Sequence, residues 1–167
     1  AMISTRGNAG KQSDVSQVNS FKSSMELEDK RFLDIVHEDW WGEPTAVMTT
    51  IFPSVIFQQQ VNSVSTRHIQ PDGHGHFDFV WTHFGFADDT PEMTARRLRQ
   101  ANLFGPAGFV SADDGEAIEL SQCGFEQKPG HRALAELGGR GVEETDHLVT
   151  ETLIRGMYEY WRKVMEA

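Results

Sequence analysis

The sequence predicts an α+β fold in which antiparallel strands are followed by helices. Three observations support this prediction. Residues 45–86 are rich in β-branched and aromatic side chains, residues 91–103 carry helix-start signals, and residues 146–167 repeat apolar side chains at helical spacing. With 38% hydrophobic and 24% charged residues, the chain is expected to form one core of ordinary size.

The first part of the chain is predicted to carry little regular structure. Residues 1–24 are mostly polar and are interpreted as a connecting segment, whereas residues 25–167 are interpreted as one domain. Within that domain, residues 25–41 place apolar side chains at mixed spacing, which is typical of a short amphipathic helix or a turn region.

The strand region is predicted to contain a break and a hairpin. Pro53 cannot donate to a sheet ladder, so residues 46–60 are expected to form two strands. The segment Pro71-Asp72-Gly73-His74-Gly75 supplies the backbone angles of a turn, and both flanks alternate in character. Four side chains of the second hairpin strand are expected to share one face: Phe77, Phe79, Trp81 and His83.

Three helices are predicted after the strands. Thr90 is a candidate cap and Pro91 suits the first helical position, which predicts a helix to about Leu103. A second helix is predicted from Pro106 through residue 125, despite its glycines. Residues 128–141 are predicted to form a loop. The last segment is predicted to be helical by the spacing of Leu153, Ile154, Met157, Tyr158, Trp161 and Val164.

Charge and cysteine content exclude several classes of protein. The net charge of -10 repels phosphate backbones, and the basic run at residues 96–99 is too short to offset it, so we expect no nucleic-acid binding. No apolar run approaches a membrane span and no leader opens the chain, so a cytoplasmic location is expected. Cys123 is the one cysteine, which excludes an internal disulfide or an iron–sulfur cluster held within this chain.

A cluster of carboxylates stands near the start of the second predicted helix. Asp113, Asp114 and Glu116 have a plain interpretation as a solvated helix face. Residues three and four positions apart share a face, however, and this separates the two aspartates. Asp114 has the less acidic neighbours, namely Val110, Ser111, Ala117 and Ile118. An inward Asp114 would point to a bound cation, because an unpaired carboxylate on an apolar stripe is costly.

Two histidine features are candidate sites. The pair His74-x-His76 has chelating spacing, but exposed histidines are common in a polar hairpin turn. His83 ends the predicted aromatic face and is a candidate pocket residue, with a hydrogen-bonded core histidine as the alternative. No phosphate-binding glycine loop, nucleophile elbow or zinc-protease motif is present in the sequence. Residue patterns alone lead to an α+β domain with a candidate pocket.

Residues 101–116, ANLFGPAGFVSADDGE, strongly resemble the iron-carboxylate segment of aromatic-ring-hydroxylating dioxygenase α subunits, a family of Rieske non-haem iron oxygenases. Residues 146–157, 51–54 and 84–89 are similar to other segments of that family. These matches span most of the chain from residue 46 onward, in the family's order. The chain is therefore identified as the C-terminal part of the catalytic domain of such a subunit.

The resemblance implies a helix-grip fold of the Bet v1-like or START-like type, with a curved antiparallel sheet packed on a long C-terminal helix and a substrate cavity between them. The fold is expected to be incomplete at its N-terminus. In the family, the aspartate ten residues after the Phe of Phe-Gly-Pro-Ala-Gly binds mononuclear Fe(II), and Asp114 stands at that position. Two histidines complete the family's 2-His-1-carboxylate triad. No histidine pair here has the family's four intervening residues.

The two Cys-x-His elements of a Rieske [2Fe-2S] cluster are also missing from the sequence. We therefore expect a fragment that is inactive alone, without the Rieske domain and the N-terminal half of the α subunit. The parent would use Fe(II) and O2 to hydroxylate an aromatic ring, with electrons passing from NAD(P)H through a reductase or ferredoxin to the Rieske cluster. Family α subunits form trimers and often bind a small β subunit, so both are expected partners.

Phe104 and Val110 match family positions that line the substrate cavity, although ordinary helix-end packing explains them as well. The sequence as a whole resembles those of the enzymes that act on salicylate, anthranilate and related aromatic acids. Two other functions stay open. One is a metal-free helix-grip module that binds a hydrophobic small molecule, and the other is an assembly role in which the aromatic side chains of residues 158–161 form an interface.

Overall fold

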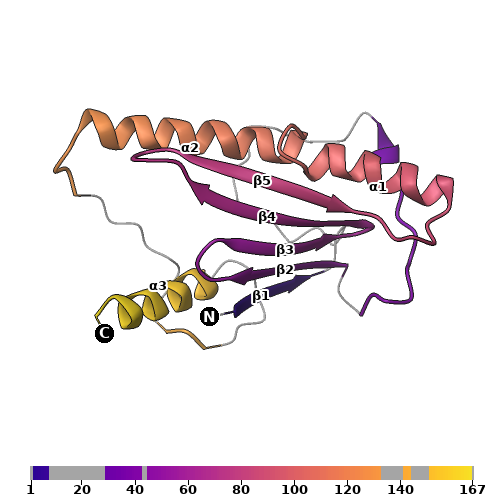
Figure 1. The fold of residues 1–167 in the computed structure, drawn as a ribbon, viewed down its shortest axis with the longest axis horizontal. Helices are drawn as coiled ribbons and strands as arrows, with labels where there is room; N and C mark the ends of the chain where they lie inside the picture. Colours follow the sequence, from indigo (N-terminus) through magenta and orange to yellow (C-terminus); the bar gives the residue numbers. More distant parts are fainter. Residues whose placement is uncertain (1, 8–28, 43–44, 133–140, 144–150, 167) are drawn as a thin grey trace, which may run out of the picture.

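The computed structural model describes residues 2–7, 29–42, 45–132, 141–143 and 151–166. Within these ranges the chain forms a five-stranded antiparallel sheet, three α-helices and one short 3-10 helix (Figure 1). The α+β class predicted from the sequence is therefore confirmed. The elements are β1 (Met2–Gly7), η1 (Lys30–Leu33), β2 (Ala46–Ile51), β3 (Val55–Gln60), β4 (Ser63–Pro71), β5 (Phe77–Phe84), α1 (Pro91–Phe104), α2 (Phe109–Gln127) and α3 (Thr152–Met165).

The sheet is a meander in which each strand pairs with the next along the chain. The predicted break at Pro53 is confirmed, because β2 ends at Ile51 and β3 begins at Val55. The predicted hairpin is β4–β5, and the amide of Asp72 donates to the carbonyl of His76 over 3.1 Å to close its turn. Gly73 and Gly75 in this turn have φ of 75° and 81°, a region that favours glycine.

The interpretation of residues 1–24 as a polar connection is wrong for Met2–Gly7, which form β1 and pair along their whole length with β2. The strand forms because the open edge of β2 offers a full set of backbone partners, which outweighs a weak local preference. Residues 8–24 lie outside the described residues. Of residues 25–41, the structure describes 29 onward, and a single 3-10 turn, η1, is the one helical element there.

The predicted helices are present with adjusted bounds. The Thr90 side chain accepts from the amide of Met93 over 3.2 Å, which confirms it as the cap of α1. The second helix, α2, begins at Phe109 instead of Pro106, because the amide of Gly108 donates to the carbonyl of Gly105 and closes a turn first. The last helix, α3, begins at Thr152. Residues 133–140 of the predicted loop lie outside the described residues.

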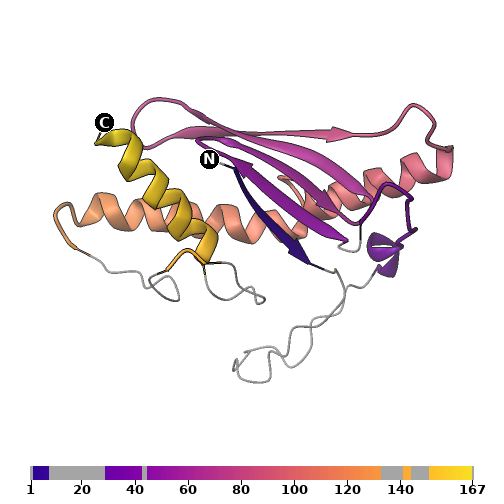
Figure 2. The same ribbon diagram turned by 90° about the horizontal axis from the view of Figure 1, so that it is seen from below.

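Helices α1 and α2 lie end to end along the β4–β5 side of the sheet, whereas α3 lies near β1 and β2 (Figures 1 and 2). The rings of Phe52 and Tyr160, 5.5 Å apart, join α3 to the turn after β2. The buried core lies at the α1 end of the molecule and includes Val61, Leu103 and Trp41. No described helix is long and apolar enough to cross a membrane.

Candidate functional site

An aromatic row runs along β5 on the face that leads toward α2. The ring centroids of Phe77 and Phe79 are 6.3 Å apart, those of Phe79 and Trp81 are 5.5 Å apart, and those of Trp81 and His83 are 6.0 Å apart. The last pair is stacked, with an angle of 28° between the rings. The prediction that these four side chains share one face is therefore confirmed.

Arg67 lies directly across from Trp81 in the β4–β5 register. Its guanidinium carbon is 4.1 Å from the centroid of the Trp81 ring, within the range of a cation–π interaction. Burial lowers the pKa of Arg67, and the negative charge of Asp114 opposes this shift. Asp114 on α2 is therefore close enough to Arg67 to act on its charge.

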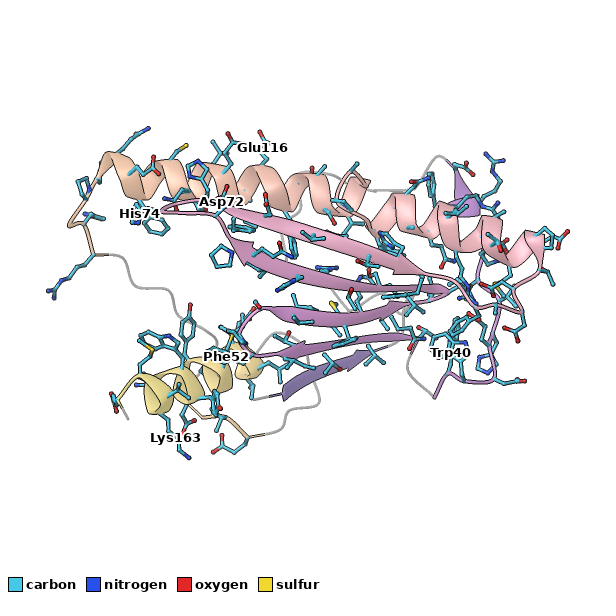
Figure 3. All side chains as sticks on the ribbon, viewed as in Figure 1. Trp40, Phe52, Asp72, His74, Glu116 and Lys163 are labelled. Carbon is cyan, nitrogen blue, oxygen red and sulfur yellow. The ribbon has the colours of Figure 1, made fainter. Side chains whose placement is uncertain are left out.

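The direction of Asp114 also follows from helix geometry. Glu116 projects from the side of α2 that faces away from the sheet (Figure 3). Residues two positions apart in a helix are separated by about 200° of rotation, which places Asp114 on the other side of α2 from Glu116. Both Asp113 and Asp114 are exposed in the structure, so the expected burial of Asp114 on an apolar stripe is not found. Most of the described residues of α2 are exposed on every side of the helix, so Asp114 does not lie on a buried stripe.

His83 lies where the aromatic row meets the junction of α1 and α2. A Cβ atom on Gly105 would stand 3.1 Å from Nε2 of His83 and 2.4 Å from the carbonyl oxygen of Ala101, so a side chain at position 105 would collide with the backbone. Partial burial lowers the pKa of His83, and the charge of Arg67 lowers it further. The imidazole is therefore neutral near pH 7.

His83 also lines a small cavity of about 110 Å³ between β5 and α1, together with Phe84, Gly85, Thr94, Leu98 and other residues. Phe104 is half-buried at the end of α1, and Val110 is 48% exposed at the start of α2. Neither of these two predicted pocket residues lines this cavity. They flank Gly105 instead, on the same junction that His83 approaches.

The described residues do not form a complete metal site. No group of three or more histidine, cysteine, aspartate and glutamate side chains in this part of the chain is arranged to hold a metal ion. His74 and His76 stand in the β4–β5 turn, where the Nδ1 atom of His76 is 3.2 Å from the carbonyl oxygen of His74. A metal site that includes Asp114 would therefore need ligands from outside the described residues.

A second charged cluster, which we call the Arg97 cluster, comprises Arg97, Glu38, Asp89 and Asn62. Nε and one terminal nitrogen of Arg97 donate to the two carboxylate oxygens of Asp89, each over 2.8 Å. The other terminal nitrogen donates to Glu38 over 3.1 Å and to the carbonyl of Asn62 over 2.6 Å. The guanidinium carbon also lies 4.7 Å from the ring centroid of Phe86. Arg97 is therefore fully paired although it is only 5% exposed.

The charges of the Arg97 cluster stabilise one another. The hydrogen bond from Arg97 lowers the pKa of Asp89. Burial raises the pKa of Glu38, but hydrogen bonds from Arg97, Asn62 and Trp40 outweigh it, so the pKa is lowered overall. Hydrogen bonds to Asp89 in turn raise the pKa of Arg97. This cluster ties α1 to the segments before β2 and after β5.

Sequence reasoning missed both arginines. The signal for Arg67 was present, because the hairpin register follows from the turn and places position 67 opposite Trp81. The signal for Arg97 was weaker. Asp89 belongs to the family-like segment at residues 84–89, but its partner Glu38 is 59 positions before Arg97 in the chain and carries no pattern that links the two.

The chain matches the family model described as ring hydroxylating alpha subunit (catalytic domain) over residues 2–167. It is 75% identical over 166 residues to a salicylate 5-hydroxylase large oxygenase component from Ralstonia sp. This match covers 99% of this chain and 39% of that protein. It is 38% identical over 148 residues to an anthranilate 1,2-dioxygenase large subunit from Burkholderia cepacia. This match covers 89% of this chain and 35% of that protein.

A third relative is a terephthalate 1,2-dioxygenase terminal oxygenase component, subunit alpha 2, from Comamonas sp.. It is 35% identical over 128 residues, which cover 77% of this chain and 31% of that protein. The chain thus spans about two fifths or less of the length of each of these relatives.

Proposed function

The chain belongs to the ring-hydroxylating α-subunit family, as part of its catalytic domain, and from this premise we propose that it supplies one iron ligand and one wall of the site at which the whole protein hydroxylates an aromatic acid. Asp114 is the proposed ligand. Phe104, Val110 and His83 are the proposed wall residues. The observation that supports the proposal is the position of Asp114 on the side of α2 opposite Glu116, from which its negative charge acts on Arg67 of β4.

The remaining parts of the reaction would come from outside these 167 residues. Two histidines would complete the mononuclear Fe(II) site with Asp114. Fe(II), O2 and electrons from a Rieske [2Fe-2S] cluster, supplied from NAD(P)H by a reductase or ferredoxin, would provide the redox chemistry. We further propose that the whole catalytic domain has the helix-grip fold, with α3 as its long C-terminal helix, and that the subunit assembles as a trimer with or without a β subunit.

Within this scheme the residues of the chain have physical roles that do not depend on the metal. The rings of Phe79 and Trp81 form an apolar wall along β5 against which an aromatic substrate can stack. The neutral imidazole of His83 leaves that wall without a second cation. The absence of a side chain at Gly105 lets β5 approach the α1–α2 junction, which brings the wall close to the start of α2.

The proposal is tested by comparing Asp114→Asn with Asp113→Asn in the full-length α subunit, assembled with its β subunit if it has one. We expect Asp114→Asn to lose mononuclear iron, with an intact Rieske spectrum, and to lower O2-dependent turnover by on the order of 100-fold or more. Asp113→Asn should retain both. If Asp114→Asn keeps its iron and its activity, the assignment is wrong and a metal-free module that binds a hydrophobic small molecule explains the chain better.

A further inference from the structure

The function proposed above gives no role to the small cavity between β5 and α1. Its volume is about 110 Å³, well below the roughly 300–1,000 Å³ of pockets that hold drug-sized ligands. Three of its lining residues, Thr94, Leu98 and Ala101, follow one another at spacings of four and three along α1, so they share one face of that helix. The cavity therefore suits a molecule of only a few atoms.

The charged residues that line this cavity are already bonded to protein groups. Both carboxylate oxygens of Asp89 accept hydrogen bonds from Arg97, and one of them also accepts from the amide of Phe86 over 2.8 Å. Arg97 donates in addition to Glu38 and to the carbonyl of Asn62. The paired cation has no donor left for an anion, and the carboxylate of Asp89 repels one. The cavity is therefore a poor site for an ion or an aromatic acid.

The other walls of the cavity are mainly apolar. Val64 of β4, Phe84 of β5, and Leu98 and Ala101 of α1 contribute hydrocarbon side chains to it. Cavities with apolar walls take up small apolar guests such as xenon, whereas an ordered water needs two to four polar partners. The walls thus favour an uncharged guest that forms no hydrogen bonds.

The cavity extends from the surface of α1 to the aromatic row of β5. Leu98 lines it and is 61% exposed, so the cavity reaches the surface of the described residues at this side chain. His83 also lines it, and the imidazole of His83 stacks on the ring of Trp81 with centroids 6.0 Å apart. A small molecule in the cavity is therefore separated from the rest of the aromatic row by a single side chain.

We infer that this cavity binds a small apolar gas and holds O2 beside the aromatic row. O2 is uncharged and apolar, so it is stabilised by leaving water for an apolar wall and needs no hydrogen-bond partner. O2 enters and leaves the cavity unchanged, so no bond forms or breaks there. The inference rests on the proposed function, which makes O2 a substrate, and it adds the place where this substrate is held before it reacts.

Ordered water is the competing occupant of the cavity. The side chains of Ser63, Thr94 and His83 line it and can form hydrogen bonds, so together they can hold a water molecule. Xenon distinguishes the two occupants, because it is apolar, close in size to O2 and visible by diffraction. Under pressure it enters an apolar cavity but does not replace water that is held by several hydrogen bonds.

The first experiment pressurises crystals of the full-length α subunit, assembled with its partners, with xenon. Ala101→Leu adds hydrocarbon inside the cavity, and Ala95→Leu makes the same change on the same helix at a position that is not among the described lining residues. We expect a xenon peak beside Ala101 in the wild type and in Ala95→Leu, and its loss in Ala101→Leu. Ordered waters on Ser63, Thr94 and His83 in the wild type, without xenon, overturn the inference.

The second experiment measures KM for O2 and for salicylate in the same three proteins. We expect Ala101→Leu to raise KM for O2 by about fourfold, the factor expected when a guest not much larger than a methylene group loses its apolar burial. KM for salicylate should stay within about twofold, because the ring does not occupy this cavity. Ala95→Leu should change neither value.

An unchanged KM for O2 in Ala101→Leu, or an equal rise in both KM values, overturns the inference, since the second result indicates a general distortion of the site. If Ala101→Leu does not fold, judged by circular dichroism and the Rieske spectrum, Leu98→Trp takes its place. This substitution blocks the exposed side of the cavity, and the same ratio of the two KM values decides the question.

The outcomes separate this inference from the proposed function, because the xenon experiment requires no turnover. If the wild type hydroxylates no aromatic acid, the proposed function fails, and a xenon peak that only Ala101→Leu removes still supports the gas site. If Asp114 proves to be an iron ligand but no xenon enters the cavity, the proposed function stands and the inference fails alone.

Discussion

Two arginines lie between the sheet and the helices α1 and α2, and they differ in their hydrogen-bond partners and in the direction of their pKa shifts. Arg97 has acceptors for its donors in Glu38, Asp89 and the Asn62 carbonyl, and the hydrogen bonds to Asp89 raise its pKa. Among the described residues, the side chain of Arg67 contacts the face of the Trp81 ring and forms no ion pair, and burial lowers its pKa. The comparison separates a cation that is fully paired from one that is half-buried without an ion pair among the described residues.

The largest effect is expected from removing the paired cation. Arg97→Met leaves Glu38 and Asp89 buried without a counter-charge, which should lower the free energy of unfolding by about 3–5 kcal/mol. Urea unfolding of the full-length α subunit measures this loss. Arg99→Met, which removes only a long exposed contact, should stay within about 1 kcal/mol. A loss of less than about 1 kcal/mol for Arg97→Met would contradict the structural role of the cluster.

An intermediate effect on stability is expected when the pH is lowered. The pKa values of Asp89 and Glu38 are lowered from usual values of 3.8 and 4.5, so these groups contribute stability that is fully present above those values. This stability is lost as the pH falls below about 4 and the carboxylates are protonated. The midpoint of urea unfolding, followed from pH 7 to pH 3, should fall more steeply for the wild type than for Asp89→Asn. Parallel curves would show that Asp89 does not contribute.

The smallest effect on stability is expected at the unpaired cation. Arg67→Met loses a cation–π contact of about 0.5–2 kcal/mol but also removes the cost of burying a charge, so the net change should lie within about 1 kcal/mol. The same urea assay measures it. A loss as large as that of Arg97→Met would show that Arg67 stabilises the fold as strongly as the paired cation does.

Local signals explain which parts of the fold the sequence could predict. The β4–β5 hairpin, the Thr90 cap and the strand break at Pro53 each depend on a few adjacent residues whose backbone preferences are strong. The strand at residues 2–7 was missed because its own composition is weak and its partner, β2, lies some forty positions later in the chain. Pairing between distant segments leaves little trace in the local pattern.

The same division applies to the candidate site. The family-like segment marked Asp114, and alternation along β5 marked His83 as a neighbour of Trp81. Neither signal revealed the unpaired guanidinium of Arg67. Whether an arginine on a strand is paired depends on which carboxylates other elements bring near it, and no rule of spacing along the chain contains that information.

The family, the class of fold and the turns follow from the order of the residues, because they depend on side-chain types at short spacing. The contrast between Arg97 and Arg67 follows from packing. It arises because α1 brings Arg97 to Glu38 and Asp89, whereas α2 holds Asp114 near Arg67 without closing an ion pair. The difference between these two cations is therefore a difference of distances in space, which the three-dimensional arrangement of the elements sets.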